Sequence, residues 1–121
     1  MTETFDAIIV GAGPGGSAAA YSLAKMGINV LMVERGKYPG AKNVMGGRMY
    51  THALNRLIPD FWNEAPVERL VTTEKLTMQH EKASVTLDFS DGEFLAPPNS
   101  VTLLRTKFDQ WFAKKAEEAG A

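Results

Sequence analysis

The sequence predicts an α/β fold, and three observations along its 121 residues carry that prediction. A short apolar run, a glycine-rich turn and a helix-forming stretch follow one another directly between residues 7 and 26. A second apolar run occupies residues 28–33. Farther along, apolar and polar residues alternate between residues 69 and 89, as in antiparallel strands with one face in water. We therefore expect a parallel βαβ unit joined to an antiparallel β region.

The first strand and the turn after it predict a nucleotide site. Residues 7–10 form the kind of apolar run that is buried on both faces of a parallel sheet. The pattern G-x-G-x-x-G then falls on Gly11, Gly13 and Gly16. Gly11 permits the tight turn, Gly13 leaves room for a pyrophosphate, and Gly16 lets the helix lie close to the sheet. The helix is expected to run to Met26, with Gly27 in a left-handed conformation after it.

Glu34 follows the second strand, residues 28–33, where an acidic side chain can accept hydrogen bonds from a ribose 2′-hydroxyl group. A carboxylate there repels a 2′-phosphate, which favours FAD or NAD over NADP. These residues alone do not choose between FAD and NAD. Glycine triplets also occur in ordinary turns, but strand, triplet, helix, second strand and acidic residue together indicate a Rossmann-like nucleotide-binding unit.

Composition limits the other classes of function. The chain has 13 basic and 14 acidic residues and a net charge of −1, which gives no sign of nucleic-acid binding. It has no cysteine, so disulfides, thiolate ligands of iron–sulfur clusters and a cysteine nucleophile are excluded within these residues. His52 and His80 have no ligand pattern around them, and we expect no metal site. The sequence contains neither a signal-peptide pattern nor a membrane-spanning apolar run, so we expect a cytoplasmic protein.

The segment after Glu34 is glycine-rich, basic and without period, which predicts a loop over residues 35–48. It is either a solvated loop or a loop that folds back over the nucleotide. In the second case Arg48 follows a flexible Gly46–Gly47 pair towards phosphate or ribityl oxygens. Residues 51–58 are expected to form a short helix capped by Thr51, and Phe61 and Trp62 to be core residues at a turn.

The remaining residues predict an inserted antiparallel pair of strands and a later strand that returns to the parallel sheet. Two antiparallel strands are expected within residues 69–89, around a polar connection at residues 80–82, followed by a turn at residues 91–92. Residues 101–104 are expected to return as a third strand of the parallel sheet. A helix over residues 106–119 is expected to be capped by Thr106 with Asp109 three residues on, burying Phe108, Trp111 and Phe112.

These elements predict three regions. Residues 1–68 would hold the βαβ unit and the cofactor loop, residues 69–99 the inserted antiparallel strands, and residues 100–121 the return strand and helix. We expect the segment to be the N-terminal part of a longer enzyme. Alone, it would be marginally stable or would associate through its strand edges.

Longer stretches of the sequence resemble known families. The run GAGPGGSAAAYSLAKMGINVLMVERG resembles the FAD-binding fingerprint of glutathione-reductase-type flavoproteins, which favours FAD over NAD. The stretches GAKNVMGGRMY and IPDFWNEAPVERLV resemble the FixC branch of the electron-transfer-flavoprotein:quinone oxidoreductase family. The stretch LLRTKFDQWFAKKAEEAGA resembles a motif shared with geranylgeranyl reductases and aromatic hydroxylases. The resemblance covers nearly the whole chain and implies the N-terminal segment of a larger, two-domain flavoprotein.

The resemblance also implies a set of cofactor-binding residues. In it, the glycine turn contacts the FAD pyrophosphate, the acidic residue contacts the adenosine ribose, and three arginines lie near the adenine, the phosphates and the ribityl chain. The implied residues are Gly11, Gly13, Pro14, Gly15, Gly16, Glu34, Arg35, Arg48 and Arg105. No catalytic acid, base or nucleophile and no metal ligand is implied.

The implied function is electron transfer. FAD would pass electrons between an electron-transfer flavoprotein and a ferredoxin-like protein or quinone, with membrane contact only in the complete protein. Three alternatives stay open: a FAD-dependent reductase or hydroxylase of a small organic or isoprenoid substrate, a non-catalytic nucleotide-binding fragment, and a simple NAD dehydrogenase. The segment alone is expected to be inactive.

Overall fold

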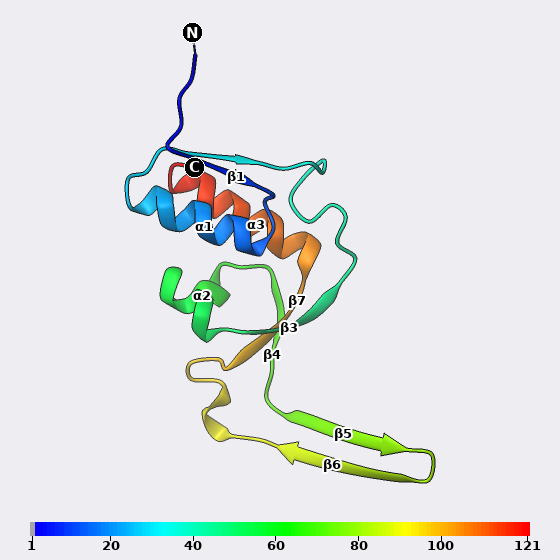
Figure 1. Ribbon diagram of the computed structural model, residues 1–121. Helices are drawn as coiled ribbons and strands as arrows, with labels where there is room; N and C mark the ends of the chain where they lie inside the picture. The colour runs from blue at the N-terminus through cyan, green and yellow to red at the C-terminus, as the bar shows by residue number, and fades with distance from the viewer. Residues whose placement is uncertain (1) are drawn as a thin grey trace.

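The computed structural model describes residues 2–121 and places an α/β unit beside an antiparallel β region (Figure 1). The strands are β1 (Ala7–Val10), β2 (Val30–Val33), β3 (Gly46–Tyr50), β4 (Val67–Leu70), β5 (Glu74–His80), β6 (Ala83–Phe89) and β7 (Ser100–Leu104). The helices are α1 (Pro14–Lys25), α2 (His52–Leu57) and α3 (Arg105–Glu118), with two short 3₁₀ helices, η1 (Phe61–Asn63) and η2 (Gly92–Phe94).

The predicted βαβ unit is present. β1 and β2 pair in parallel, from Ala7 opposite Val30 to Val10 opposite Val33. Gly27 follows Met26, the C-cap residue of α1, and has a φ of +80°, which confirms its expected left-handed conformation. The carboxyl ends of both strands point towards the same side as the N-terminal ends of α1 and α3 (Figure 1). This common edge is where a ligand binds in folds of this kind.

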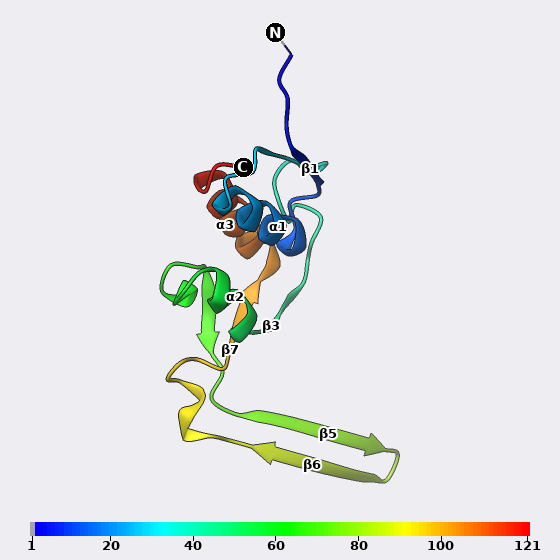
Figure 2. The same ribbon diagram turned by 60° about the vertical axis from the view of Figure 1, so that its left-hand side comes forward.

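Both long helices cover the same face of the two-stranded sheet. α1 and α3 lie side by side in Figures 1 and 2, and buried Ala20 and Ala116 let them approach closely around Val30. The expected burial of β1 on both faces is wrong for this chain. Ile8 is 64% exposed and Val10 is 84% exposed, because they face away from the helices.

A second sheet is built around β7, which pairs antiparallel with β3 on one side and with β4 on the other. The expectation that residues 101–104 add a third parallel strand is therefore wrong. A short apolar run is compatible with either strand direction, and here the pairing with Gly46–Tyr50 decides it. For the same reason the predicted loop ends before residue 46.

The main core lies between this sheet, α2, η1 and α3. Phe61 and Phe108 are at most 1% exposed, and Trp62 and Trp111 pack against the same cluster. The expected burial of the aromatic face of α3 is thus confirmed. Thr51 precedes α2, but its side chain does not cap the helix. Its hydroxyl group donates instead to the carbonyl oxygens of Pro98 and Asn99, which ties α2 to β7.

β5 and β6 form a hairpin that projects from the rest of the chain in both views (Figures 1 and 2). Its turn is at Glu81 and Lys82. The hairpin confirms the predicted antiparallel pair, although β4 is a separate strand that ends at Leu70. Among residues 2–121, no helix has the length and apolarity needed to cross a membrane.

Candidate functional site

The glycine turn joins the carboxyl ends of β1 and β2 to the start of α1. Gly11 has a φ of +102°, a conformation that side chains disfavour, and its N–H donates to the Val33 carbonyl oxygen over 2.7 Å. A Cβ atom on Gly16 would lie 1.8 Å from the Gly11 carbonyl oxygen. Gly16 is therefore required for α1 to pack against the end of β1.

The N-terminal end of α1 is open to an anion. Gly13 stands at the N-cap position, no side chain caps the helix, and its first turn has no acidic residue. Pro14 has no N–H, so the unpaired amides of the first turn include those of Gly15 and Gly16. A Cβ atom on Gly13 would have no atom within 4 Å, which means that a ligand can approach the backbone there. The amides and the helix dipole together favour a phosphate.

Glu34 lies beside this turn. Its Oε2 accepts a hydrogen bond from the Ala12 N–H over 2.8 Å, and its Oε1 accepts one from the Gly36 N–H over 2.7 Å. The hydrogen bond from the Gly36 amide, which has the larger effect, and the bond from the Ala12 amide hold the pKa of Glu34 below its usual value of 4.5. The side chain is a carboxylate at neutral pH, and each oxygen keeps a lone pair for a further donor.

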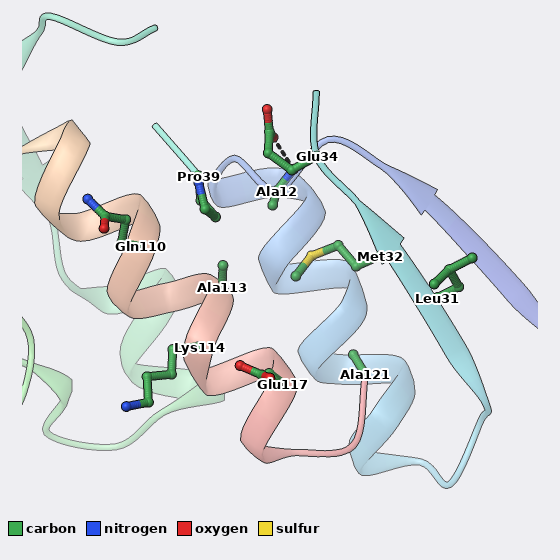
Figure 3. A pocket seen from close by; sticks show the side chains of 10 residues that line it. All are labelled: Ala12, Leu31, Met32, Glu34, Pro39, Gln110, Ala113, Lys114, Glu117 and Ala121. Atoms are coloured by element: carbon green, nitrogen blue, oxygen red, sulfur yellow. Dashed lines mark hydrogen bonds between the residues drawn. The ribbon is translucent and has the colours of Figure 1, made fainter. Parts of the chain in front are cut away.

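A groove of about 540 Å³ brings Glu34 and Ala12 together with the loop after β2 and with α3. In Figure 3, Glu34 stands at one end of the groove, near Pro39 and across from Gln110. Toward the other end, the groove follows β2 past Met32. Arg35 is next to Glu34 in sequence and is exposed.

The loop after β2 also packs tightly against the first turn of α3. Gly40 has a φ of +80°, and a Cβ atom there would lie 3.0 Å from the Asp109 Cβ and 3.1 Å from the Arg105 carbonyl oxygen. The positive φ and these close contacts together favour glycine at this position. The loop that starts at the predicted ribose-binding residue is therefore fixed to the helix that carries Arg105.

Arg105 is the first residue of α3, and Leu104 is at the N-cap position. The predicted capping by Thr106 and Asp109 is therefore wrong. Asp109 instead accepts two hydrogen bonds from Arg105, from Nε over 2.8 Å and from Nη2 over 3.0 Å. This bonding raises the pKa of Arg105 above its usual value. The spacing in the sequence could have predicted this ion pair, because residues four apart share a helix face.

Arg48 belongs to β3 and not to a loop, because Gly46–Tyr50 pairs with β7. Its Nη1 lies 2.8 Å from Glu74 Oε1, an ion pair without hydrogen-bond geometry, and its Nη2 donates to the Tyr50 hydroxyl over 2.6 Å. These three residues line a second pocket, of about 720 Å³, between β3 and the β5–β6 hairpin. Arg48 thus lines a different pocket from Glu34.

The described residues, 2–121, contain no group of three or more His, Asp or Glu side chains that could hold a metal ion. The open end of α1 offers backbone donors to a ligand, and the carboxylate of Glu34 offers an acceptor beside them.

Comparison with known proteins assigns the class. The family model described as FAD dependent oxidoreductase matches residues 6–118. The chain therefore belongs to the FAD dependent oxidoreductase family. The chain is similar to Protein FixC of Escherichia coli strain K12, with 53% identity over 120 residues, which are 98% of this chain. The chain spans 28% of the length of that relative.

Solved structures share the fold. A geranylgeranyl bacteriochlorophyll reductase-like protein from Thermoplasma acidophilum superimposes with a TM-score of 0.74 and 30% identity, over 98% of this chain and 29% of that one. A myxobacterial chondrochloren halogenase, described as a variant of FAD-dependent halogenases, gives a TM-score of 0.71 at 24% identity, over 98% of this chain and 28% of its own. The second likeness shows the fold alone.

The contact at Gly16 predicts a large effect of one methyl group. Gly16→Ala should lower the free energy of unfolding by about 3 kcal/mol, because the new Cβ collides with the backbone of the glycine turn. Gly15→Ala is the matched control. A Cβ there has no atom within 4 Å, so it should change stability by less than about 1 kcal/mol. Urea unfolding followed by circular dichroism measures both, and equal effects would contradict the geometry.

The bonds at Glu34 predict its titration. Because the folded pKa is lowered, the carboxylate contributes to stability above the usual value of 4.5, and this contribution is lost as pH falls through the lower, folded pKa. In an NMR titration, the amide shifts of Ala12 and Gly36 should change together with a midpoint below 4.5. A midpoint above that value, or separate midpoints for the two amides, would mean that the two bonds do not hold the charge.

Proposed function

We propose that the protein, at its natural length, is a FAD-dependent oxidoreductase that passes electrons between an electron-transfer flavoprotein and a ferredoxin-like protein or quinone. The observation that carries the proposal is the open N-terminal end of α1 beside the carboxylate of Glu34, in a chain that belongs to the FAD dependent oxidoreductase family. The proposed cofactor-binding residues in the turn are Gly11, Gly13, Pro14, Gly15 and Gly16.

The geometry of the turn supports FAD as the ligand. The accessible backbone at Gly13 and the first-turn amides of α1 suit a pyrophosphate, and a charged Glu34 suits the two hydroxyls of an unsubstituted ribose. Glu34 can keep the Ala12 bond while accepting from the ribose, because each carboxylate oxygen has two lone pairs. Bound FAD would supply the electron-accepting and electron-donating chemistry.

The three proposed arginines differ in how many of their donors are free to contact the cofactor. Arg105 uses two of its five N–H donors on Asp109, so three can meet an anion. Arg35 is exposed beside Glu34, on the adenosine side. Arg48 pairs with Glu74, so a contact with the cofactor would require it to share or exchange that partner.

The choice of redox partners rests on the similarity to FixC proteins, at 53% identity for the Escherichia coli relative. In this proposal the chain's own residues bind and orient the cofactor, and none acts as a catalytic acid, base or nucleophile. The division into residues 1–68, 69–99 and 100–121, the cytoplasmic location and any membrane contact of the protein at its natural length stay predictions.

A second candidate is a FAD-dependent reductase or hydroxylase of a small organic or isoprenoid molecule. The similarity to the Thermoplasma acidophilum geranylgeranyl bacteriochlorophyll reductase-like structure, at 30% identity, favours it over other flavoenzyme reactions. The two candidates share the cofactor site and differ in what reduces the flavin.

Anaerobic stopped-flow measurement of flavin absorbance separates the two. The purified protein at its natural length is mixed with reduced electron-transfer flavoprotein in one experiment and with NADH or NADPH in another. Electron transfer predicts that the flavoprotein reduces the flavin at least about tenfold faster than either nicotinamide. Faster reduction by NADPH, accelerated by an isoprenoid substrate, would favour the reductase. Bound nucleotide without any redox response would favour a non-catalytic binding role.

A further inference from the structure

Asp109 is a buried carboxylate for which the proposed function has no role. It lies in the second turn of α3, and its side chain is 2% exposed. Removing a carboxylate from water is strongly unfavourable unless good partners compensate for it. Its partner in the structure is Arg105, whose side chain is 25% exposed and reaches the surface.

The bonding between the two residues fixes the direction of the guanidinium group. Asp109 accepts from Nε and Nη2 of Arg105, so the carboxylate and the guanidinium edge lie in one plane. Nη1, with both of its protons, and one proton of Nη2 are directed away from Asp109. A lone arginine at the start of a helix would have many rotamers, whereas this one is held in a single geometry.

Asp109 also lies where the loop after β2 meets α3. A Cβ atom at Gly40 would lie 3.0 Å from the Cβ of Asp109 and 3.1 Å from the carbonyl oxygen of Arg105, which is tighter than side chains usually pack. The same loop starts at Glu34, and its Pro39 lines one groove with Ala12, Glu34 and Gln110 (Figure 3). The first turn of α3, which carries Arg105, is therefore held against the loop that starts at Glu34.

We propose that Asp109 is a positioning residue, which holds Arg105 so that its three remaining donors meet the diphosphate of the bound nucleotide. The inference rests on the proposed function, because it assumes a nucleotide diphosphate at the glycine turn. The charge of Asp109 by itself repels a diphosphate. Asp109 can therefore favour binding only through the orientation that it imposes on Arg105.

The repulsion by Asp109 and its orientation of Arg105 change the FAD dissociation constant in opposite directions. Asp109→Asn removes the repulsion and one of the two accepted hydrogen bonds while nearly preserving the shape of the side chain. If orientation dominates, the dissociation constant for FAD should rise about tenfold. If Asp109 acted only as a neutralising charge, the same variant would bind FAD more tightly.

The experiment compares the protein at its natural length, freed of nucleotide, with the variants Asp109→Asn, Arg105→Gln and the double variant. FAD binding is measured by quenching of flavin fluorescence, and ADP and adenosine by competition. Glu68→Gln is the control, because its carboxylate pairs with Lys107 at the surface and lines neither the groove at Glu34 nor the pocket at Arg48. It should leave all three dissociation constants unchanged.

The proposal predicts that Arg105→Gln weakens FAD binding about tenfold or more and that the double variant binds no more weakly than Arg105→Gln alone. ADP should follow FAD, and adenosine, which has no phosphate, should be unaffected. A purely structural Asp109 would weaken all three ligands, and the losses in the double variant would multiply. That result, or an unchanged or tighter FAD complex of Asp109→Asn, would overturn the inference.

If Asp109→Asn does not fold, Asp109→Glu replaces it, which keeps the charge and moves it by one methylene group. Asp109→Glu should weaken FAD binding when Arg105 is present and should not weaken it when residue 105 is glutamine. If Asp109→Glu leaves the dissociation constant for FAD unchanged, the inference is overturned. If the unsubstituted protein binds no FAD, the proposed function fails first and the inference with it. If the unsubstituted protein binds FAD but the Asp109 variants do not behave as predicted, only the inference about Asp109 fails.

Discussion

The approach of α1 to the end of β1 is the contact on which the rest of this structure depends. It is possible because Gly16 has no side chain where a Cβ would lie 1.8 Å from the Gly11 carbonyl oxygen. The contact sets the direction in which the first-turn amides of α1 point. It also places the turn beside Glu34, whose carboxylate, after β2, accepts a hydrogen bond from the Ala12 N–H, after β1. Helix, turn and acidic residue therefore form a single unit.

The second helix extends that unit. α3 packs along α1 through small residues, and its first turn meets the loop after β2 at Gly40, where the positive φ and the close contacts favour glycine. As a result the N-terminal end of α3, more than seventy residues after Glu34 in the chain, lies on the same side of the structure as the N-terminal end of α1 (Figure 1). The buried ion pair of Arg105 with Asp109 makes this end of α3 rigid, since a displaced guanidinium would leave an uncompensated carboxylate.

Local patterns were sufficient for some of these features and not for others. The positions of β1, α1 and β2, the left-handed Gly27 and the β5–β6 hairpin followed from period and from glycine placement, because short-range sterics determine them. The direction of β7 and the strand at Gly46–Tyr50 depend on pairing between segments about fifty residues apart, which no local pattern contains. Asp109 was misassigned because its spacing suits both a capping partner of Thr106 and an ion-pair partner of Arg105. The helix begins at Arg105, so that Thr106 lies inside it and only the ion pair forms.

The central claim is that the glycine turn and Glu34 bind the adenosine diphosphate part of FAD. The most direct test is the visible absorbance spectrum of the protein purified at its natural length, with identification of the nucleotide released on denaturation. The account predicts an oxidised flavin spectrum and the release of FAD. Release of NAD, or no nucleotide bound even after FAD is added back, would contradict it.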